Sequence, residues 1–216
     1  MAQYFHIHPT DPQLRLARAA VAILKDGGVL VYPTDSCYAL GCQIGQKNAL
    51  ERIRRIRGVD EHHNLTLVCR DLSELSLYAR VTNSDYRVLR ANTPGPYTFI
   101  LPATREVPRR LMHARRRTIG LRVPDHRVTQ ALLAELGEPL LSTTLILSGK
   151  DLPLSDPQEM RVLLEQQVDL VIDGGYCGLE PTTVIALNDG SAQVIRRGKG
   201  NLAAFHLFAE PDTEFS

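Results

Sequence analysis

The chain has 216 residues, of which 44% are hydrophobic and 23% are charged, and its formal net charge at neutral pH is +1. These values are ordinary for a globular protein and exclude disordered, collagen-like and coiled-coil chains. The sequence contains no apolar stretch that approaches the roughly 18 residues of a transmembrane helix.

The N-terminus lacks the basic and apolar segments of a secretory signal peptide. The four cysteines form no C-x-x-C pair, so we expect scattered reduced thiols rather than a disulfide frame or a zinc site: Cys37, Cys42, Cys69 and Cys177. Both features favour a cytoplasmic protein without a membrane partner.

Charge is distributed unevenly along the chain. Residues 1–150 carry 21 Lys and Arg against 13 Asp and Glu, whereas residues 151–216 carry 4 against 11. Arginine is in large excess, with 21 Arg to 4 Lys. Because the guanidinium fork matches phosphate and carboxylate geometry, this excess indicates anionic ligands. Compositional drift in a GC-rich genome would give the same ratio.

The first predicted element is an extended segment around 4–8, which contains His6 and His8. A His-x-His pair is half of a metal site, but no acidic or Cys partner stands near it, so an edge strand is favoured. Apolar spacing then predicts a helix over 12–25, ended by Asp26-Gly27-Gly28, and a strand over 29–32 before a loop that begins at Pro33.

The central elements alternate between helices and strands. They are a helix over 47–57, a strand over 65–69, a helix from the N-cap Asp71 to about Tyr78, a helix near 84–90, a rigid turn at 93–96 and a strand over 97–101. An arginine-rich loop over 105–117 leads to a strand over 118–123. Pro124 is predicted to start a helix that Gly137 ends.

The last third is predicted to hold one helix among several strands: a strand over 140–147, a helix over 157–166 and strands over 169–172, 183–187 and 193–196. The whole pattern predicts a single α/β domain with a mixed sheet over residues 12–200. It is preceded by an extended segment over 1–11 and followed by a tail over 201–216.

Familiar nucleotide-binding and nucleophile motifs are absent. The sequence contains neither a G-x-x-x-x-G-K-[ST] loop nor a G-x-G-x-x-G that opens a helix after the first strand. It also lacks a G-x-S-x-G nucleophile elbow. We therefore assign no catalytic nucleophile and no metal ligand.

Hydroxyl-rich segments accompany three predicted strands. Thr34-Asp-Ser36 follows the first, Ser142-Thr-Thr144 lies within or at the end of the second, and Pro181-Thr-Thr183 opens the third. In α/β sheets, ligands bind beyond strand ends. Together with Arg57, Arg122 and Arg196, these segments could form a cavity for phosphate and carboxylate groups. For each hydroxyl alone, a cap or turn bond to the backbone is the simpler explanation.

The same segments resemble the YrdC-like threonylcarbamoyl-AMP synthase family. The resemblance rests on motifs in the family's order over about residues 12–200: Tyr32-Pro-Thr-Asp-Ser-Cys-Tyr-Ala-Leu-Gly41, Arg55-Ile-Arg57 with Asn64-Leu-Thr-Leu67, Pro94-Gly-Pro-Tyr-Thr98, Thr118-Ile-Gly-Leu-Arg-Val-Pro124, Ser142-Thr-Thr144 with Leu147-Ser-Gly149, Pro181-Thr-Thr-Val-Ile185 and Ile195-Arg-Arg-Gly198. The Asp-Ser-x-Tyr-Ala-Leu and Thr-Pro-Gly-x-Tyr-Thr-Phe segments are most similar to the YciO branch.

This resemblance implies a twisted mixed sheet, flanked by helices, around a basic concave cavity. Synthases of the family convert threonine, bicarbonate and ATP, with Mg²⁺, into threonylcarbamoyl-AMP and pyrophosphate for tRNA modification. The matching positions imply that the threonine moiety is held by Thr34, Arg122, Ser142 and Thr182. They imply that the nucleotide is held by Arg55, Arg57, Asn64, Thr118, Thr144 and Arg196.

The chain departs from the synthase pattern at four positions. The Lys-x-Arg pair is Arg55-x-Arg57, the Asn of Ser-Ala-Asn is Ile146, and Cys69 and Leu152 replace a histidine and a serine. Replacing Asn by Ile removes two donors and one acceptor, and the loss of one transition-state donor costs about 10²–10³ in rate. We therefore expect weak synthase activity, or altered activity such as hydrolysis of threonylcarbamoyl-AMP.

Two other segments carry weaker indications. His62 and His63 beside Glu61 could form an acid/base pair, although a solvated loop is the simpler interpretation. The arginines of 105–117 could bind tRNA or double-stranded RNA through phosphates. The alternative function is thus a noncatalytic RNA-binding module, although no interleaved aromatic residue is present to stack on bases.

Overall fold

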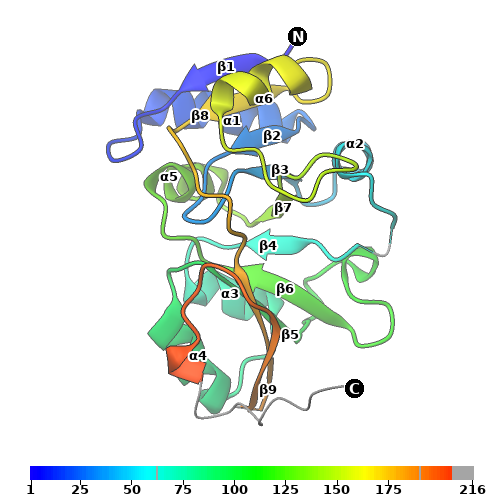
Figure 1. Ribbon diagram of the computed structural model, residues 1–216. Helices are drawn as coiled ribbons and strands as arrows, with labels where there is room; N and C mark the ends of the chain where they lie inside the picture. Colours follow the sequence, from blue (N-terminus) through cyan, green and yellow to red (C-terminus); the bar gives the residue numbers. More distant parts are fainter. Residues whose placement is uncertain (62, 190, 206–216) are drawn as a thin grey trace.

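The computed structural model describes residues 1–61, 63–189 and 191–205 (Figure 1). All named strands of this part form one ten-stranded sheet in the order β1-β8-β2-β3-β7-β4-β6-β5-β9-β10, with parallel and antiparallel neighbours. They are β1 (Gln3–His6), β2 (Leu30–Tyr32), β3 (Ala39–Gln43), β4 (Thr66–Val68), β5 (Tyr97–Pro102), β6 (Thr118–Arg122), β7 (Leu140–Thr144), β8 (Leu170–Asp173), β9 (Thr183–Asn188) and β10 (Ser191–Arg196).

Helices flank this twisted open sheet, which confirms the predicted mixed α/β class. They are α1 (Leu14–Lys25), α2 (Lys47–Arg57), α3 (Leu72–Tyr78), α4 (Asn83–Asn92), α5 (Arg127–Leu136) and α6 (Pro157–Leu164), with 3-10 turns at Arg109–Leu111 and Ala203–Phe205. Figure 1 shows α1 and α5 beside the upper strands and α3 and α4 beside the lower strands. Within the described residues, no helix is long and apolar enough to cross a membrane.

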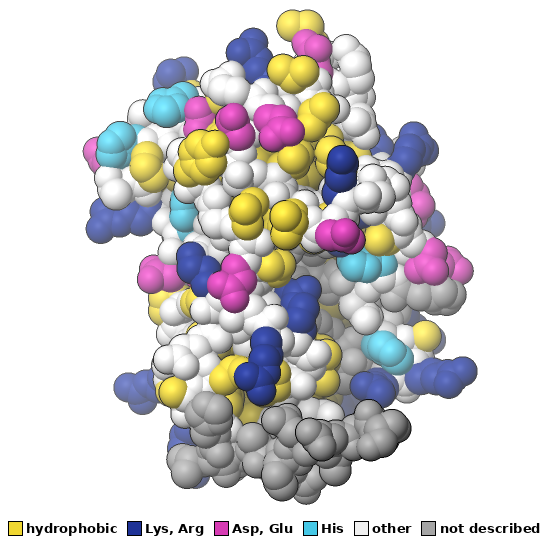
Figure 2. Space-filling model, viewed as in Figure 1, with side chains coloured by type: hydrophobic (Ala, Val, Ile, Leu, Met, Phe, Trp, Pro, Cys, Tyr) yellow, Lys and Arg dark blue, Asp and Glu magenta, His cyan; other side chains and the backbone are white. Residues whose placement is uncertain are grey.

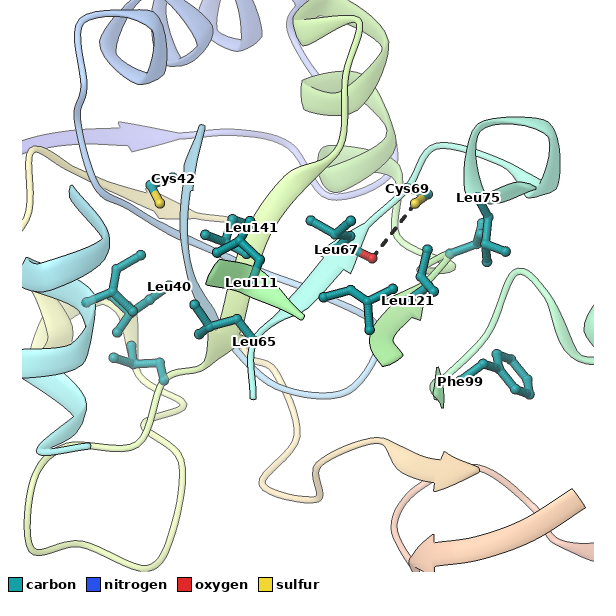
Figure 3. Close-up of a cluster of buried hydrophobic side chains, with 14 of the residues drawn as sticks. Leu40, Cys42, Leu65, Leu67, Cys69, Leu75, Phe99, Leu111, Leu121 and Leu141 are labelled. Carbon is teal, nitrogen blue, oxygen red and sulfur yellow. Dashed lines mark hydrogen bonds between the residues drawn. The ribbon is translucent and has the colours of Figure 1, made fainter. Parts of the chain in front are cut away.

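Alternating side chains of the strands build a separate core on each face of the sheet. On one face α2, α3, α4 and α6 cover Leu40, Leu67, Phe99 and Leu121, which belong to the cluster in Figure 3. On the other face, α1 and α5 pack on the alternate strand residues, such as Tyr32. This arrangement follows from the two-residue period of a strand.

The second face is covered only in part. The core beneath α1 and α5 draws on strands β1, β2, β3, β7 and β8, and only Val68 comes from the five strands beyond β7 in the sheet. Among the described residues, no helix therefore packs over the same face of β4, β6, β5 and β9. This uncovered half of the sheet is where the candidate site lies.

Most predicted elements are confirmed, including the edge strand β1, the helix over 47–57 and the Asp71 cap, whose side chain accepts from the Glu74 amide. The loop predicted from Pro33 onward was wrong in part, because β3 follows it and pairs with β2 and β7. The four cysteines are free, as predicted.

Two predicted boundaries were wrong. Helix α5 starts at Arg127 rather than at Pro124, because the Pro124 carbonyl accepts from the Gln130 side chain and the Asp125 amide donates to Asp35 instead of to a helical turn. The strand predicted over 140–147 ends at Thr144, because the Ile146 amide donates to the Thr144 carbonyl and turns the chain.

The described parts of both chain ends pack against the domain. Strand β1 pairs in parallel with β8. Phe205 is buried, and its ring centroid lies 5.7 Å from that of Tyr97. The remainder of the predicted tail, 206–216, lies outside the described residues.

The end of α2 requires a glycine. Gly58 caps the helix with φ of +64°, a left-handed conformation that glycine adopts without strain. A Cβ at this position would lie only 2.2 Å from the Ser148 hydroxyl oxygen. The close approach places Arg57, in the last turn of α2, beside the segment that follows β7.

Candidate functional site

A cavity of about 590 Å³ lies over the uncovered half of the sheet. Its floor is made by every second residue of five strands: Thr66 and Val68, Thr98 and Ile100, Gly120 and Arg122, Ser142 and Thr144, and Val184 and Ala186. Intervening residues such as Leu67 and Leu121 belong to the core on the opposite face, while Ile119 and Thr143 also reach the cavity. The alternation of the strands thus converts scattered polar residues into one surface.

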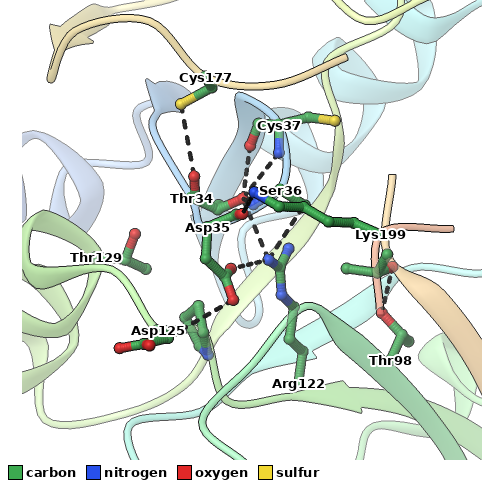
Figure 4. A network of polar contacts seen from close by, with 12 residues as sticks. Thr34, Asp35, Ser36, Cys37, Thr98, Arg122, Asp125, Thr129, Cys177 and Lys199 are labelled. Atoms are coloured by element: carbon green, nitrogen blue, oxygen red, sulfur yellow. Dashed lines mark hydrogen bonds and ion pairs between the residues drawn. The ribbon is translucent and has the colours of Figure 1, made fainter. Parts of the chain in front are cut away.

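Arg122 is the most buried cation of this surface. It is only 7% exposed, and its Nη2 donates to Thr34 Oγ1 at 3.3 Å, to Ser36 Oγ at 3.1 Å and to the Asp35 carboxylate (Figure 4). The Nε atom of Arg122 is buried and has no hydrogen-bond partner in the part of the chain that the structure describes. One donor of a buried guanidinium is therefore left for a ligand or a water molecule.

The loop that follows β2 holds the partners of Arg122 in place. The Thr34 hydroxyl donates to the Cys37 carbonyl at 2.6 Å and accepts from the amides of Ser36 and Cys37. On the other side, the Asp35 carboxylate accepts from the Asp125 amide at 3.1 Å. This part of the site is preorganised by its own backbone bonds.

Two further hydroxyls are fixed by neighbouring strands. The hydroxyl of Ser142 donates to the Leu40 carbonyl at 3.0 Å and accepts from Tyr32 at 2.6 Å. Burial raises the pKa of Tyr32 to about 12, so its hydroxyl stays protonated and acts as the donor. Thr182 lies 2.9 Å from Thr98, oxygen to oxygen.

Arg57 and Arg196 face the same cavity from α2 and β10. Arg57 Nη1 donates to the Ile146 carbonyl at 2.8 Å, and Arg196 Nη2 donates to the Thr182 carbonyl at 2.9 Å. Burial lowers the pKa of Arg57, and the charge of Arg196 lowers it further; burial lowers the pKa of Arg196 as well. Among the described residues no carboxylate pairs with either guanidinium.

Two partly desolvated cations that repel each other without a counter-ion are unfavourable unless an anion joins them. Among the described lining residues there are three more basic groups, His63, His113 and Arg116, and no Asp or Glu. On the face in Figure 2, the lower part, where Figure 1 draws β5 and β9, shows Lys and Arg but no Asp or Glu among the described residues. The cavity therefore suits an anionic ligand.

Nine of the ten residues predicted to bind ligand meet at this cavity. Thr118, Thr144, Asn64 and the residues discussed above line it, and Thr34 stands directly behind Arg122. Arg55 does not join them. It is exposed and lines a different hollow that also contains Arg52 and Asp169.

Several residues of the cavity were not assigned a role from the sequence. Asp35, the partner of Arg122, lies within the quoted motifs, as do the lining residues Cys37 and Thr98, so the motifs offered a signal for all three. His113 offered none. His63, for which a solvated loop was the simpler interpretation, is half-buried and lines the cavity. His62 lies outside the described residues.

The predicted Mg²⁺ has no cage of protein carboxylates here. Lining residues supply hydroxyls and the Asn64 amide, and the described residues contain no group of three or more His, Cys, Asp or Glu suited to a metal. Mg²⁺ therefore stays a prediction, as an ion carried by nucleotide phosphates.

Comparison with known proteins extends this description. A family model, Sua5_yciO_yrdC, described as "Telomere recombination", matches residues 22–198. The "Uncharacterized protein YciO" of Escherichia coli K12 is 57% identical over 205 residues, which are 95% of this chain and 100% of the relative. The crystal structure of E. coli YciO superimposes with a TM-score of 0.91 over the same shares of the two chains.

Two more distant relatives have informative names. The "Threonylcarbamoyl-AMP synthase" of Chromobacterium violaceum is 34% identical over 184 residues, which are 84% of this chain and 94% of the relative. The structure of P. abyssi Sua5 complexed with L-threonine has a TM-score of 0.81 at 23% identity, over 90% of this chain and 57% of that one. At that identity the likeness concerns the fold.

Proposed function

The chain belongs to the Sua5/YciO/YrdC family, and on this premise we propose that it binds threonylcarbamoyl-AMP in the cavity and hydrolyses it, with weak synthesis from threonine, bicarbonate and ATP. The observation that carries the proposal is the pair Arg57 and Arg196. Arg57 is half-buried and Arg196 is more exposed, burial lowers the pKa of both, and among the described residues neither guanidinium has a carboxylate partner. A phosphate between them would supply the missing charge.

The two halves of the ligand have chemically distinct partners. Arg122, with its buried and unpartnered Nε, suits the threonine carboxylate, and Thr34, Ser142 and Thr182 support it. Around the phosphate, the apolar side chains of Ile100, Val184 and Ile195 offer surface to a planar base. Thr118, Thr144 and Asn64 supply hydrogen bonds to the nucleotide.

Ile146 is the reason to favour hydrolysis over synthesis. Its backbone carbonyl accepts from Arg57, while its apolar side chain lines the cavity. An amide at this position could donate to pyrophosphate or to a metal-bound water, and isoleucine cannot. Binding of the adenylate is thereby kept while the departure or attack of pyrophosphate loses a stabilising group.

A direct test separates the two directions. Purified protein is incubated with threonine, bicarbonate and Mg²⁺-ATP, and separately with threonylcarbamoyl-AMP, and the adenylates are followed by chromatography. We expect AMP to form from threonylcarbamoyl-AMP well above the rate without protein, and little threonylcarbamoyl-AMP to form from ATP. If AMP forms no faster than without protein, hydrolysis is wrong.

A second candidate is RNA binding by the arginine-rich loop. All six arginines of this loop are exposed: Arg105, Arg109, Arg110, Arg115, Arg116 and Arg117. Such binding would weaken steeply with added salt, because released counterions drive it. Titration of tRNA at increasing salt tests it, and a flat response would rule it out.

A further inference from the structure

Hydrolysis requires a group that takes a proton from water, and the proposed function has assigned none. At neutral pH such a group must be an unprotonated base with a free lone pair within the cavity. The described lining residues contain no Asp, Glu, Lys or Tyr. The remaining titratable candidates are Cys37, His63 and His113.

Cys37 is not a base under these conditions. Its side chain is buried, and burial raises the pKa of the thiol to about 11 even though Arg122, Lys199 and Arg196 act in the opposite direction. The thiol therefore keeps its proton at neutral pH.

His113 has its accepting nitrogen occupied. Nδ1 lies 3.1 Å from the backbone nitrogen of Arg116 and 3.3 Å from that of Arg115, and both of these groups donate N–H. Nδ1 is thus the acceptor, and in the neutral ring the proton must sit on Nε2. His113 can donate to a ligand but cannot accept a proton from water at Nε2.

His63 has the required properties. It is half-buried on the rim beside Arg57, its Nε2 lies 3.5 Å from Thr143 Oγ1, and the described residues offer no partner to Nδ1. Burial lowers its pKa, as do the nearby Arg57 and Arg54, while Asp60 acts in the opposite direction. The ring is therefore neutral at physiological pH and holds a lone pair for a proton.

The geometry points to His63 as the general base of the cavity, which deprotonates the water that attacks a bound acyl-adenylate. This inference rests on the proposed function. The water oxygen bonds to phosphorus while the bond from phosphorus to the acyl oxygen breaks, and the electron pair leaves with the threonine carbamate. AMP is the second product. The carbamate then takes up a proton and releases CO₂ to give threonine, and His63 returns its proton to solvent.

Arg57 links this base to the phosphate. Its charge lowers the pKa of His63, and among the described residues no carboxylate pairs with its guanidinium. A phosphate bound to Arg57 would place its phosphorus near the imidazole. Thr143, on β7, would orient the ring through its hydroxyl.

The experiment compares wild type with His63→Gln and His63→Ala in the hydrolysis of threonylcarbamoyl-AMP, with the rate in the absence of protein subtracted. We expect both variants to lose about 100-fold or more in kcat, while binding of AMP changes little. Added imidazole should restore part of the rate of His63→Ala. His8→Gln, which changes an exposed histidine far from the cavity, serves as the control.

The pH profile gives an independent readout. In the wild type the acid limb of kcat/KM should lie below the ordinary histidine pKa of 6.5, and His63→Gln should lack that limb. In isotopically labelled water the label should enter AMP. A wild type without hydrolysis would overturn the proposed function itself. Hydrolysis that continues unchanged in both His63 variants, or label absent from AMP, would overturn only the role of His63.

Discussion

Asp35→Asn is the substitution with the largest expected effect on the framework of the site. Asp35 and Arg122 form an ion pair in which the side chains are 10% and 9% exposed, respectively. Asparagine keeps an acceptor oxygen but carries no charge, so the guanidinium loses its counter-ion and keeps only neutral acceptors, among them the hydroxyls of Thr34 and Ser36. Breaking a buried pair from one side costs about 3–5 kcal/mol, because a desolvated charge stays behind.

The expected loss is large enough for ordinary melting experiments. A chain of this size loses about 2–4 °C per kcal/mol, so Asp35→Asn should lower the unfolding midpoint by roughly 6–20 °C. Glu135→Gln is the matched control, because it removes the acidic partner of Arg18 in a pair that is 25% and 67% exposed. Such exposed pairs contribute about 0–1 kcal/mol.

Binding of L-threonine should restore part of the stability that Asp35→Asn loses. If Arg122 receives the threonine carboxylate, L-threonine at high concentration should raise the midpoint of Asp35→Asn more than that of wild type, because only the variant lacks the competing carboxylate. A midpoint for Asp35→Asn equal to that of Glu135→Gln would refute the assignment of a buried, functional ion pair.

Further predictions concern residues that hold the site in place, and each is tested by measuring stability in urea or thermal unfolding. Tyr32→Phe removes the donor to Ser142 and should cost about 1–3 kcal/mol; an unchanged midpoint would contradict it. Gly58→Ala should destabilise more than Gly137→Ala, because a Cβ meets a serine oxygen at 2.2 Å only at the former; equal losses would refute this. Burial lowers the pKa of His126 from 6.5, so the unfolded chain gains a proton first and stability falls as pH drops below 6.5. Acidification should therefore destabilise His126→Gln less than wild type, and an equal pH dependence in both would contradict the assignment.

The fold could be predicted largely from sequence because most elements have clear periodicity. Strand β3 was not predicted. It is buried on both faces, so its sequence shows no alternation of apolar and polar residues, and Gly41 interrupts its apolar run. Pro124 has the sequence position of a helix start, but the Asp125 amide bonds to Asp35, a contact from a distant loop. Tertiary hydrogen bonds of this kind cannot be inferred from local pattern.

Only part of the site could be predicted from the sequence. Strand-end hydroxyls and their arginines were identifiable because a sheet brings alternate residues of neighbouring strands to one face. The pair Arg55 and Arg57 could not be resolved, because residues two apart on a helix point in different directions and the residue type alone does not say which faces the ligand. The role of His63 depends on desolvation by the folded cavity, which no motif records.

The placement of the two arginines of α2 offers the most direct test of the central claim. Binding of a non-hydrolysable threonylcarbamoyl-adenylate analogue is measured by titration calorimetry for wild type, Arg57→Ala and Arg55→Ala. The account predicts that Arg57→Ala weakens binding about 10- to 100-fold, whereas Arg55→Ala, which removes an exposed side chain outside the cavity, leaves it unchanged. Equal affinities for wild type and Arg57→Ala, or an equal loss in both variants, would contradict it.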